Sequence, residues 1–168
     1  MIRYSQERGN LIMITFGIEG FKHKKMMEEY VLNMLDYLDI SDESEADIEI
    51  TLTDRCDGDA GGYCHGDDEQ VEIELATHVQ DYEIPYERLM INLAHEMVHA
   101  KQLISGELCD KGVVGVTNTP EKIELSMKQV WKGEEYIDCP YWDQPWEKEA
   151  YSMEKNVFKA CFPIGLTI

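Results

Sequence analysis

The sequence predicts a single α+β domain over residues 1–168, built from a small, mostly antiparallel sheet and several helices. Residues 46–54 and 70–78 alternate apolar and polar side chains, which is typical of strands with one buried face. Residues 21–38, 86–104 and 145–161 carry apolar side chains at helical spacing or on nearly every side. At 168 residues the chain is long enough for one domain with a substantial core and too short for two comfortable ones.

The first elements along the chain are a hairpin and an amphipathic helix. Residues 2–6 and 11–17 flank a polar, turn-like break at 7–10, so we expect them to pair. The helix expected over 21–38 has one apolar stripe that would face a core. The stripe consists of Met26, Met27, Tyr30, Val31, Met34, Leu35 and Leu38.

The rest of the chain is divided by turn and helix-boundary signals. The Gly- and Asp-rich segment 54–69, between the two strands, is predicted to be a loop. Pro85 opens the next helix, which we expect to end near Gly106. Residues 110–144 are less regular, and we expect a helix near 120–131 and then an aromatic loop before the last helix.

Charge and cysteine content restrict the class of protein. The chain has 15 basic and 34 acidic residues, a net charge of −19, so we expect it to bind neither nucleic acid nor anionic membranes. No stretch approaches the roughly 18–20 apolar residues of a membrane span, and no small-residue cleavage site follows the apolar run at 11–18. Five irregularly spaced cysteines fit a reduced compartment, so we expect a cytoplasmic protein.

The stretch INLAHEMVHAKQ, residues 91–102, places polar groups on an otherwise apolar helix. His95 and His99 are four residues apart, so on a helix they project from one face and can take two positions on one metal ion. Glu96 lies about 100° around the helix, where it can reach a water that the metal activates. This H-E-x-x-H arrangement is typical of zinc enzymes in which the Glu is the general base. A pair of ordinary core histidines is the weaker alternative.

Catalytic zinc needs a third protein ligand and an open coordination position. No histidine follows His99, so the third ligand would be an acidic residue, or His65 or His78 from upstream. Cys56 and Cys64, together with His65, form a rival group of metal-binding residue types. Their spacing is not that of a zinc knuckle and no fourth ligand stands out, so a solvated loop is the preferred interpretation.

The better candidates for the third ligand lie in the last helix, in PWEKEA, residues 145–150. Glu147 lies about 60° from the centre of the apolar stripe, at its edge, whereas Glu149 lies about 100° away on the other side. Ala150 would also let two helices approach closely. Glu147 is therefore the expected ligand and Glu149 the alternative.

These motifs resemble those of the gluzincin metallopeptidases, and more narrowly of small SprT-like and minigluzincin domains of phages and prokaryotes. The resemblance spans about residues 46–162 and is carried by GGYC (61–64), VEIEL (71–75), HEMVHAKQ (95–102), WKG (131–133) and PWEKEA (145–150). It implies a zincin-like fold with one zinc ion per chain, bound by His95, His99 and Glu147. Many gluzincins have Asp or Asn four residues after the Glu ligand, where this chain has Tyr151.

The resemblance also implies a mode of substrate binding. In such folds an edge strand beside the H-E-x-x-H helix pairs with extended peptide, and residues 71–75 are the expected strand. A tyrosine near the metal would stabilise the oxyanion, with Tyr63, Tyr136 and Tyr141 as equal candidates. Gln102, one turn beyond His99, would hold a supporting hydrogen bond.

Two functions remain after these arguments. The leading hypothesis is a zinc-dependent metallopeptidase that hydrolyses peptide bonds with Glu96 as general base. The alternative is a catalytically weak binding or inhibitory protein with the same fold, whose acidic surface meets a basic partner. A structural zinc domain is disfavoured, because three ligands beside a Glu leave the open position that a catalyst uses.

Overall fold

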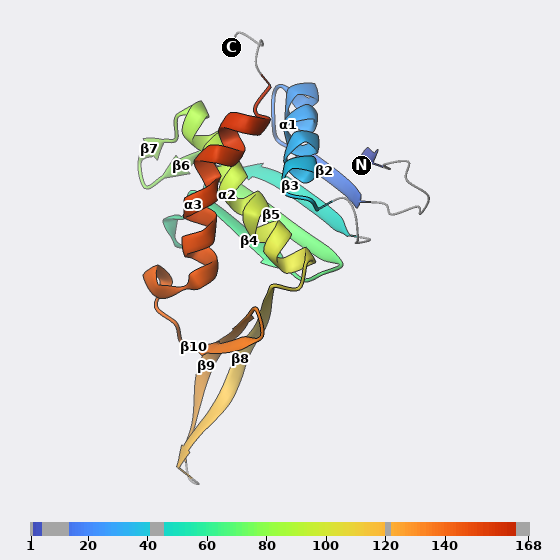
Figure 1. Ribbon diagram of the computed structural model, residues 1–168. Coiled ribbons are helices and arrows are strands. Elements are labelled where there is room, and N and C mark those ends of the chain that lie inside the picture. Colours follow the sequence, from blue (N-terminus) through green and yellow to red (C-terminus); the bar gives the residue numbers. More distant parts are fainter. Residues whose placement is uncertain (1, 5–13, 41–45, 120–121, 164–168) are drawn as a thin grey trace, which may run out of the picture.

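The computed structural model describes residues 2–4, 14–40, 46–119 and 122–163 (Figure 1). Over these ranges the chain forms helices and several small sheets, which confirms the predicted α+β class. The helices are α1 (Lys24–Tyr37), α2 (Tyr86–Ile104) and α3 (Pro145–Cys161), all close to their predicted bounds. In the part of the chain that is described, no helix is both long and apolar enough to cross a lipid bilayer.

The main sheet is mixed, so the prediction of a mostly antiparallel sheet is wrong. Its strands lie in the order β1, β2, β3, β5, β4, with antiparallel pairing at both ends and parallel pairing of β3 with β2 and with β5. The parallel pairs arise because α1 crosses over between β2 and β3, and β4 intervenes between β3 and β5. The strands are β1 (Ile2–Tyr4), β2 (Ile14–Glu19), β3 (Asp47–Thr53), β4 (Gly62–Gly66) and β5 (Gln70–Ala76).

The pairing of β1 with β2 confirms the N-terminal hairpin, whose predicted turn at 7–10 lies outside the described ranges. The predicted loop at 54–69 is instead partly regular, with a short 3₁₀ turn, η1 (Asp57–Asp59), and the strand β4. Strand β4 could not be recognised in the sequence because it begins and ends with glycine, a residue typical of loops. Gly66 has a φ of +138°, and a Cβ there would collide with the Gln70 carbonyl, so this position requires glycine.

The presence of β4 corrects the expected edge strand. Residues 71–75 belong to β5, which is hydrogen-bonded to β3 on one side and to β4 on the other. Its backbone groups are therefore already paired and leave no edge for a peptide. The edge at this side of the sheet is β4.

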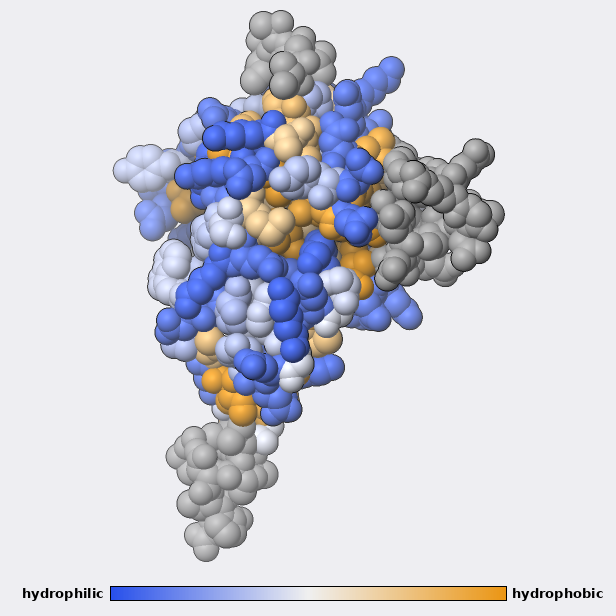
Figure 2. All heavy atoms as spheres, in the orientation of Figure 1, coloured by the Kyte–Doolittle hydropathy of each residue, from blue (hydrophilic) through white to orange (hydrophobic). Residues whose placement is uncertain are grey.

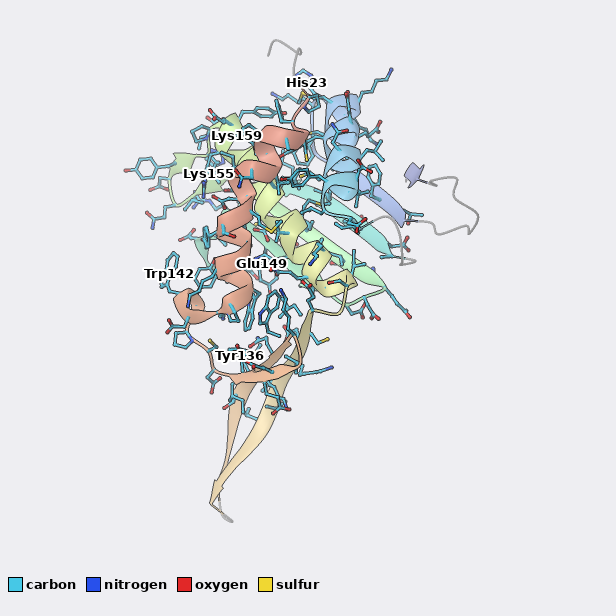
Figure 3. The ribbon with its side chains drawn as sticks, in the orientation of Figure 1. His23, Tyr136, Trp142, Glu149, Lys155 and Lys159 are labelled. Atoms are coloured by element: carbon cyan, nitrogen blue, oxygen red, sulfur yellow. The ribbon has the colours of Figure 1, made fainter. Side chains whose placement is uncertain are left out.

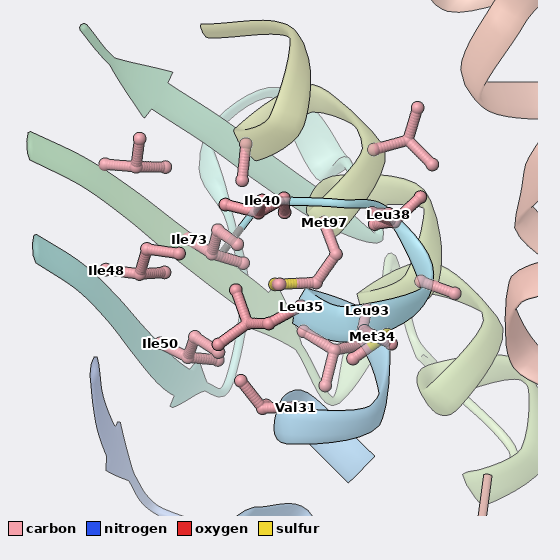
Figure 4. Packing of buried hydrophobic residues seen from close by; sticks show 14 of the residues in the cluster. Val31, Met34, Leu35, Leu38, Ile40, Ile48, Ile50, Ile73, Leu93 and Met97 are labelled. Atoms are coloured by element: carbon pink, nitrogen blue, oxygen red, sulfur yellow. The ribbon is translucent and has the colours of Figure 1, made fainter. Parts of the chain in front are cut away.

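The core lies between the sheet and the helices, as Figure 4 shows. Helix α2 contacts β4 and β5 on one side and α3 on another, which explains why its side chains are buried nearly all round. Its central position follows from the apolar sequence around the H-E-x-x-H motif. Core side chains labelled in the figure come from α1 (Val31, Leu35), β3 (Ile48, Ile50), β5 (Ile73) and α2 (Leu93, Met97).

A long hairpin projects from this body (Figure 1), where the sequence predicted a helix near 120–131. The strands β8 (Leu108–Thr119) and β9 (Lys122–Trp131) pair antiparallel, and β10 (Glu134–Ile137) adds to β9. The prediction of a helix is wrong. The apolar residues of 122–131 recur at every second position, which is the pattern of a strand. We call β8, β9 and β10 the arm. The remaining short elements are β6 (His78–Val79), β7 (Tyr82–Glu83) and the 3₁₀ turn η2 (Tyr141–Asp143).

Candidate metal centre

Two histidines of α2 and one glutamate of α3 converge in the interior. His95 and His99 are both buried, and their Nε2 atoms lie 3.2 Å apart. One carboxylate oxygen of Glu147 lies 3.3 Å from His95 Nε2, and the other lies 3.3 Å from His99 Nε2. One potential ligand atom from each residue falls within 4.8 Å of the others. The structure thus brings together the three ligands expected from the sequence.

The start of α3 holds Glu147 in this position. Pro145 opens the helix, where its missing N–H is not needed, and Glu147 lies in the first turn. Trp146 is buried beside it, and Ala150 is fully buried where α3 packs against α2. The small side chain at 150 leaves room for a neighbouring helix at this turn of α3, one turn after Glu147.

The second nitrogen of each imidazole has a hydrogen-bond acceptor. His95 Nδ1 lies 2.9 Å from Glu154 Oε2, and His99 Nδ1 lies 2.8 Å from Gln102 Oε1. Glu154 is buried and also accepts a hydrogen bond from Arg88 Nη1 at 3.4 Å. Since both acceptors face Nδ1, each neutral imidazole carries its proton there and keeps its Nε2 lone pair for the centre.

The orientation of Gln102 is itself determined by its neighbours. Its Nε2 donates to the Trp146 carbonyl at 3.1 Å and to Glu149 Oε2 at 2.8 Å, so its Oε1 must face His99. Glu149 is held in turn by Lys132 at 3.1 Å, and Figure 3 shows it beside α2. Gln102 therefore makes the supporting hydrogen bond expected from the sequence. Glu149 does not join the cluster and instead supports Gln102.

With their protons on Nδ1, the two imidazoles present only acceptors toward Glu147. Two Nε2 lone pairs and a carboxylate point toward one another, and Glu147 Oε2 is buried with no hydrogen-bond partner. Such an arrangement is unfavourable unless a cation lies between the groups, and two nitrogens with one carboxylate suit zinc. The residues therefore fit a bound metal ion.

Glu96 lies next to the cluster without belonging to it. It is buried between α2 and β4, where a Cβ added to Gly62 would lie 2.6 Å from Glu96 Oε1. Burial raises the pKa of Glu96 to about 7; His99 opposes the rise, while the carboxylates of Glu147 and Glu154 add to it. The absence of a side chain at Gly62 lets the edge strand approach this carboxyl group closely.

The raised pKa of Glu96 leads to a prediction for the metal-free protein. A carboxyl group whose pKa rises from 4.5 to about 7 on folding binds its proton more tightly in the folded state. The free energy of unfolding is therefore expected to fall as pH rises through this interval. Glu96→Gln removes this loss, so the variant should exceed wild type by about 3 kcal/mol above pH ~8 and match it below pH ~4.

Urea unfolding in the presence of a chelator, followed for both proteins across this pH range, measures the difference. A stability gap that is the same at every pH would contradict the assigned cause.

The centre opens onto a cleft of about 960 Å³, lined by η1, β4, α2, the base of the arm and the start of α3. Of the three tyrosines proposed for the oxyanion, Tyr63 and Tyr141 line this cleft. Tyr136 does not, because its ring packs edge-on against Trp146 beneath α3 (Figure 3). Burial, the Tyr151 hydroxyl 3.1 Å away and the nearby Glu147 carboxylate raise the pKa of Tyr141, so it remains a proton donor.

The sequence interpretation missed Glu154. Tyr151 occupies the position four residues after Glu147, and its ring packs edge-on against His95 with centroids 4.6 Å apart. The acid that orients His95 stands one turn later, seven residues after Glu147. A signal was present, because Glu154 lies on the same stripe as the buried Ala150 and Val157, where an unpaired carboxylate would be costly.

The rival site does not form. Among the residues that the structure describes, His95, His99 and Glu147 make the one group able to hold a metal, and Cys56, Cys64 and His65 make none. All five cysteines are free. His65 pairs with Glu72 at 3.2 Å, and His78 pairs at 2.9 Å with Asp54, which follows β3. Neither histidine joins the centre.

Comparisons of the chain with protein-family models, with curated proteins and with solved structures each found no match. The interpretation of this centre therefore depends on its own geometry.

Proposed function

We propose that the protein is a zinc-dependent metallopeptidase of the gluzincin type, with His95, His99 and Glu147 as zinc ligands and Glu96 as general base. One observation carries the proposal: His95, His99 and Glu147, whose Oε2 has no hydrogen-bond partner, converge beside a buried carboxyl group on an open cleft. Three protein ligands leave the open coordination position that hydrolysis requires.

When bound, zinc would polarise the scissile carbonyl and make an attacking water more acidic. Glu96 takes the proton of that water and passes it to the leaving amine. Its position against Gly62 holds the carboxyl group between the cluster and the edge strand. Tyr141, protonated and at the wall of the cleft, is placed to donate to the carbonyl oxygen as charge develops there.

The proposed substrate is an extended segment of peptide or protein that pairs with β4. Every residue of β4 lines the cleft, and its outer edge has no partner strand among those described. A peptide added there gains backbone hydrogen bonds without sequence specificity, next to Glu96. We therefore assign peptide pairing to β4 and not to the interior strand at 71–75.

Zinc content tests the centre. Wild type is expected to hold one zinc ion per chain after zinc loading and dialysis, measured by mass spectrometry. His95→Ala and Glu147→Ala should lose it, because each removes a ligand, whereas Glu149→Ala should keep it. Zinc retained in all four proteins would place the metal elsewhere and remove the basis for the proposal.

Hydrolysis tests the reaction. Zinc-loaded wild type should cleave an unfolded protein, and a chelator should stop the cleavage until zinc is restored. A protein that holds zinc at these residues yet cleaves no unfolded protein would refute the peptidase and favour the binding protein with an acidic surface.

A further inference from the structure

Apart from Tyr37 on α1, the large apolar side chains exposed in the described chain lie in two places, the cleft and the arm. In the described chain, five exposed aromatic residues line the cleft, and all the exposed large aliphatic residues lie on the arm. Figure 2 shows apolar surface on the arm below the body. The aromatic residues are Tyr63, Tyr82, Tyr141, Trp142 and Tyr151; the aliphatic ones are Val113, Leu125, Met127 and Ile137.

Three of the four aliphatic residues share one face of the arm. Alternate residues of a strand face the same side, so Leu125, Met127, Gln129 and Trp131 of β9 lie on one face. Directly paired residues also share a face, which adds Val113, opposite Met127, and Asp110, opposite Gln129.

Asp110 and Val113 are three residues apart, and a β-bulge between them lets both side chains lie on this face. Ile137 pairs with Lys128 and therefore lies on the opposite face.

This face is continuous with the cleft. At the base of the arm, Leu108 and Trp131 are buried against the body. The next pair, Asp110 and Gln129, lines the cleft. Beyond them the face continues into Val113 and Met127, and then Leu125, with 62%, 42% and 77% of their surface exposed. We call Val113, Leu125 and Met127 the arm patch.

We propose that the arm patch binds the part of a polypeptide substrate that leaves the cleft, and so selects long unfolded segments with apolar residues several positions away from the scissile bond. This inference rests on the proposed peptidase function. The arm patch continues the wall of the cleft, so a chain that crosses the cleft past Asp110 and Gln129 meets the patch next. At about 3.3 Å per residue, roughly four further residues reach Leu125, so short peptides miss it.

The experiment compares a long and a short substrate on the zinc-loaded protein. The long one is ribonuclease unfolded by reduction and carboxamidomethylation, a modification that adds no negative charge for this acidic chain to repel. The short one is an internally quenched peptide around a bond cleaved in it. The test variant is Leu125→Gln/Met127→Gln, and the matched control is Ile137→Gln on the opposite face. All three side chains are exposed, and thermal unfolding checks that each variant is folded.

The double variant is expected to lower kcat/KM for unfolded ribonuclease about tenfold, mainly through KM, and to leave the short peptide unchanged. Ile137→Gln should change neither. Equal loss on both substrates, or no loss on the long one, would overturn the inference while leaving the peptidase intact.

Binding separates this inference from the proposed function. In zinc-loaded Glu96→Gln, the Kd for fluorescent unfolded ribonuclease should rise about tenfold when the arm patch is changed, whether or not wild type cleaves it. An unchanged Kd, or no binding at all, would refute the patch. Sedimentation at several concentrations tests the other occupant, since a dimer abolished by the double variant would assign the face to a second copy of the chain.

Discussion

Glu96→Gln is expected to keep its zinc and to lose about 10²- to 10⁴-fold in kcat. Glutamine has nearly the same shape as glutamate, so it fills the space against Gly62, but it cannot take a proton from water. KM should change little, because Glu96 makes no contact that holds the ground-state peptide. Zinc analysis and steady-state hydrolysis of unfolded protein, on the same preparation, measure both quantities.

Glu83→Gln is the matched control. Glu83 is an exposed carboxylate that lines the same cleft, so the variant removes one negative charge there without touching the buried cluster. Its kcat should stay close to that of wild type. A comparable loss in the control would mean that the field of the cleft, rather than proton transfer by Glu96, governs the rate.

The elements that the sequence predicted well are those whose boundaries depend on local chemistry. Helix α2 begins after Pro85 and ends just before Gly106. Its apolar residues on every side predicted a helix enclosed by other elements. Strand β4 could not be recognised, because glycines that serve its close contacts with Glu96 and Gln70 look like loop residues in the sequence. The arm could not be predicted because a short apolar pattern fits both the helical and the strand period until a partner strand is known.

In the candidate site, too, the residues predicted from the sequence are those that depend on local spacing. The spacing of His95 and His99 on a helix is a local property, and the edge position of Glu147 on its own helix could be read from the apolar stripe. The hydrogen bond of Gln102 to His99 also follows from spacing within α2, whereas the role of Glu154 depends on how α2 and α3 pack. The Tyr151 position illustrates this, since the missing acid is replaced from the next turn of α3.

Gln102 and Glu154 are buried for the same physical reason. Gln102 and Glu154 lie in the interface of α2 and α3, where an unpaired amide or carboxylate would destabilise the fold. Each instead holds one imidazole by its Nδ1. The helix interface thus orients both histidines without a bound cation, at the expense of apolar contacts that the same positions would otherwise make.

Glu154→Ala is expected to weaken zinc binding about 10- to 100-fold while leaving the three ligands in place. Without Glu154 Oε2, the His95 ring loses the acceptor that keeps its proton on Nδ1, so the tautomer with Nε2 protonated, which cannot bind zinc, gains population. Competition with a chromogenic chelator gives the Kd for zinc, and the ¹⁵N shifts of the His95 ring in the metal-free protein report the tautomer.

Arg88→Ala distinguishes this orienting role from a structural ion pair. Arg88 is the other partner of Glu154, at 3.4 Å, and its half-exposed side chain can turn into water. Its removal leaves the contact between Glu154 and His95 intact, so zinc affinity and the His95 tautomer should change far less than in Glu154→Ala. If both variants weakened zinc equally, Glu154 would act through the ion pair with Arg88, and the inferred hold on His95 would be wrong.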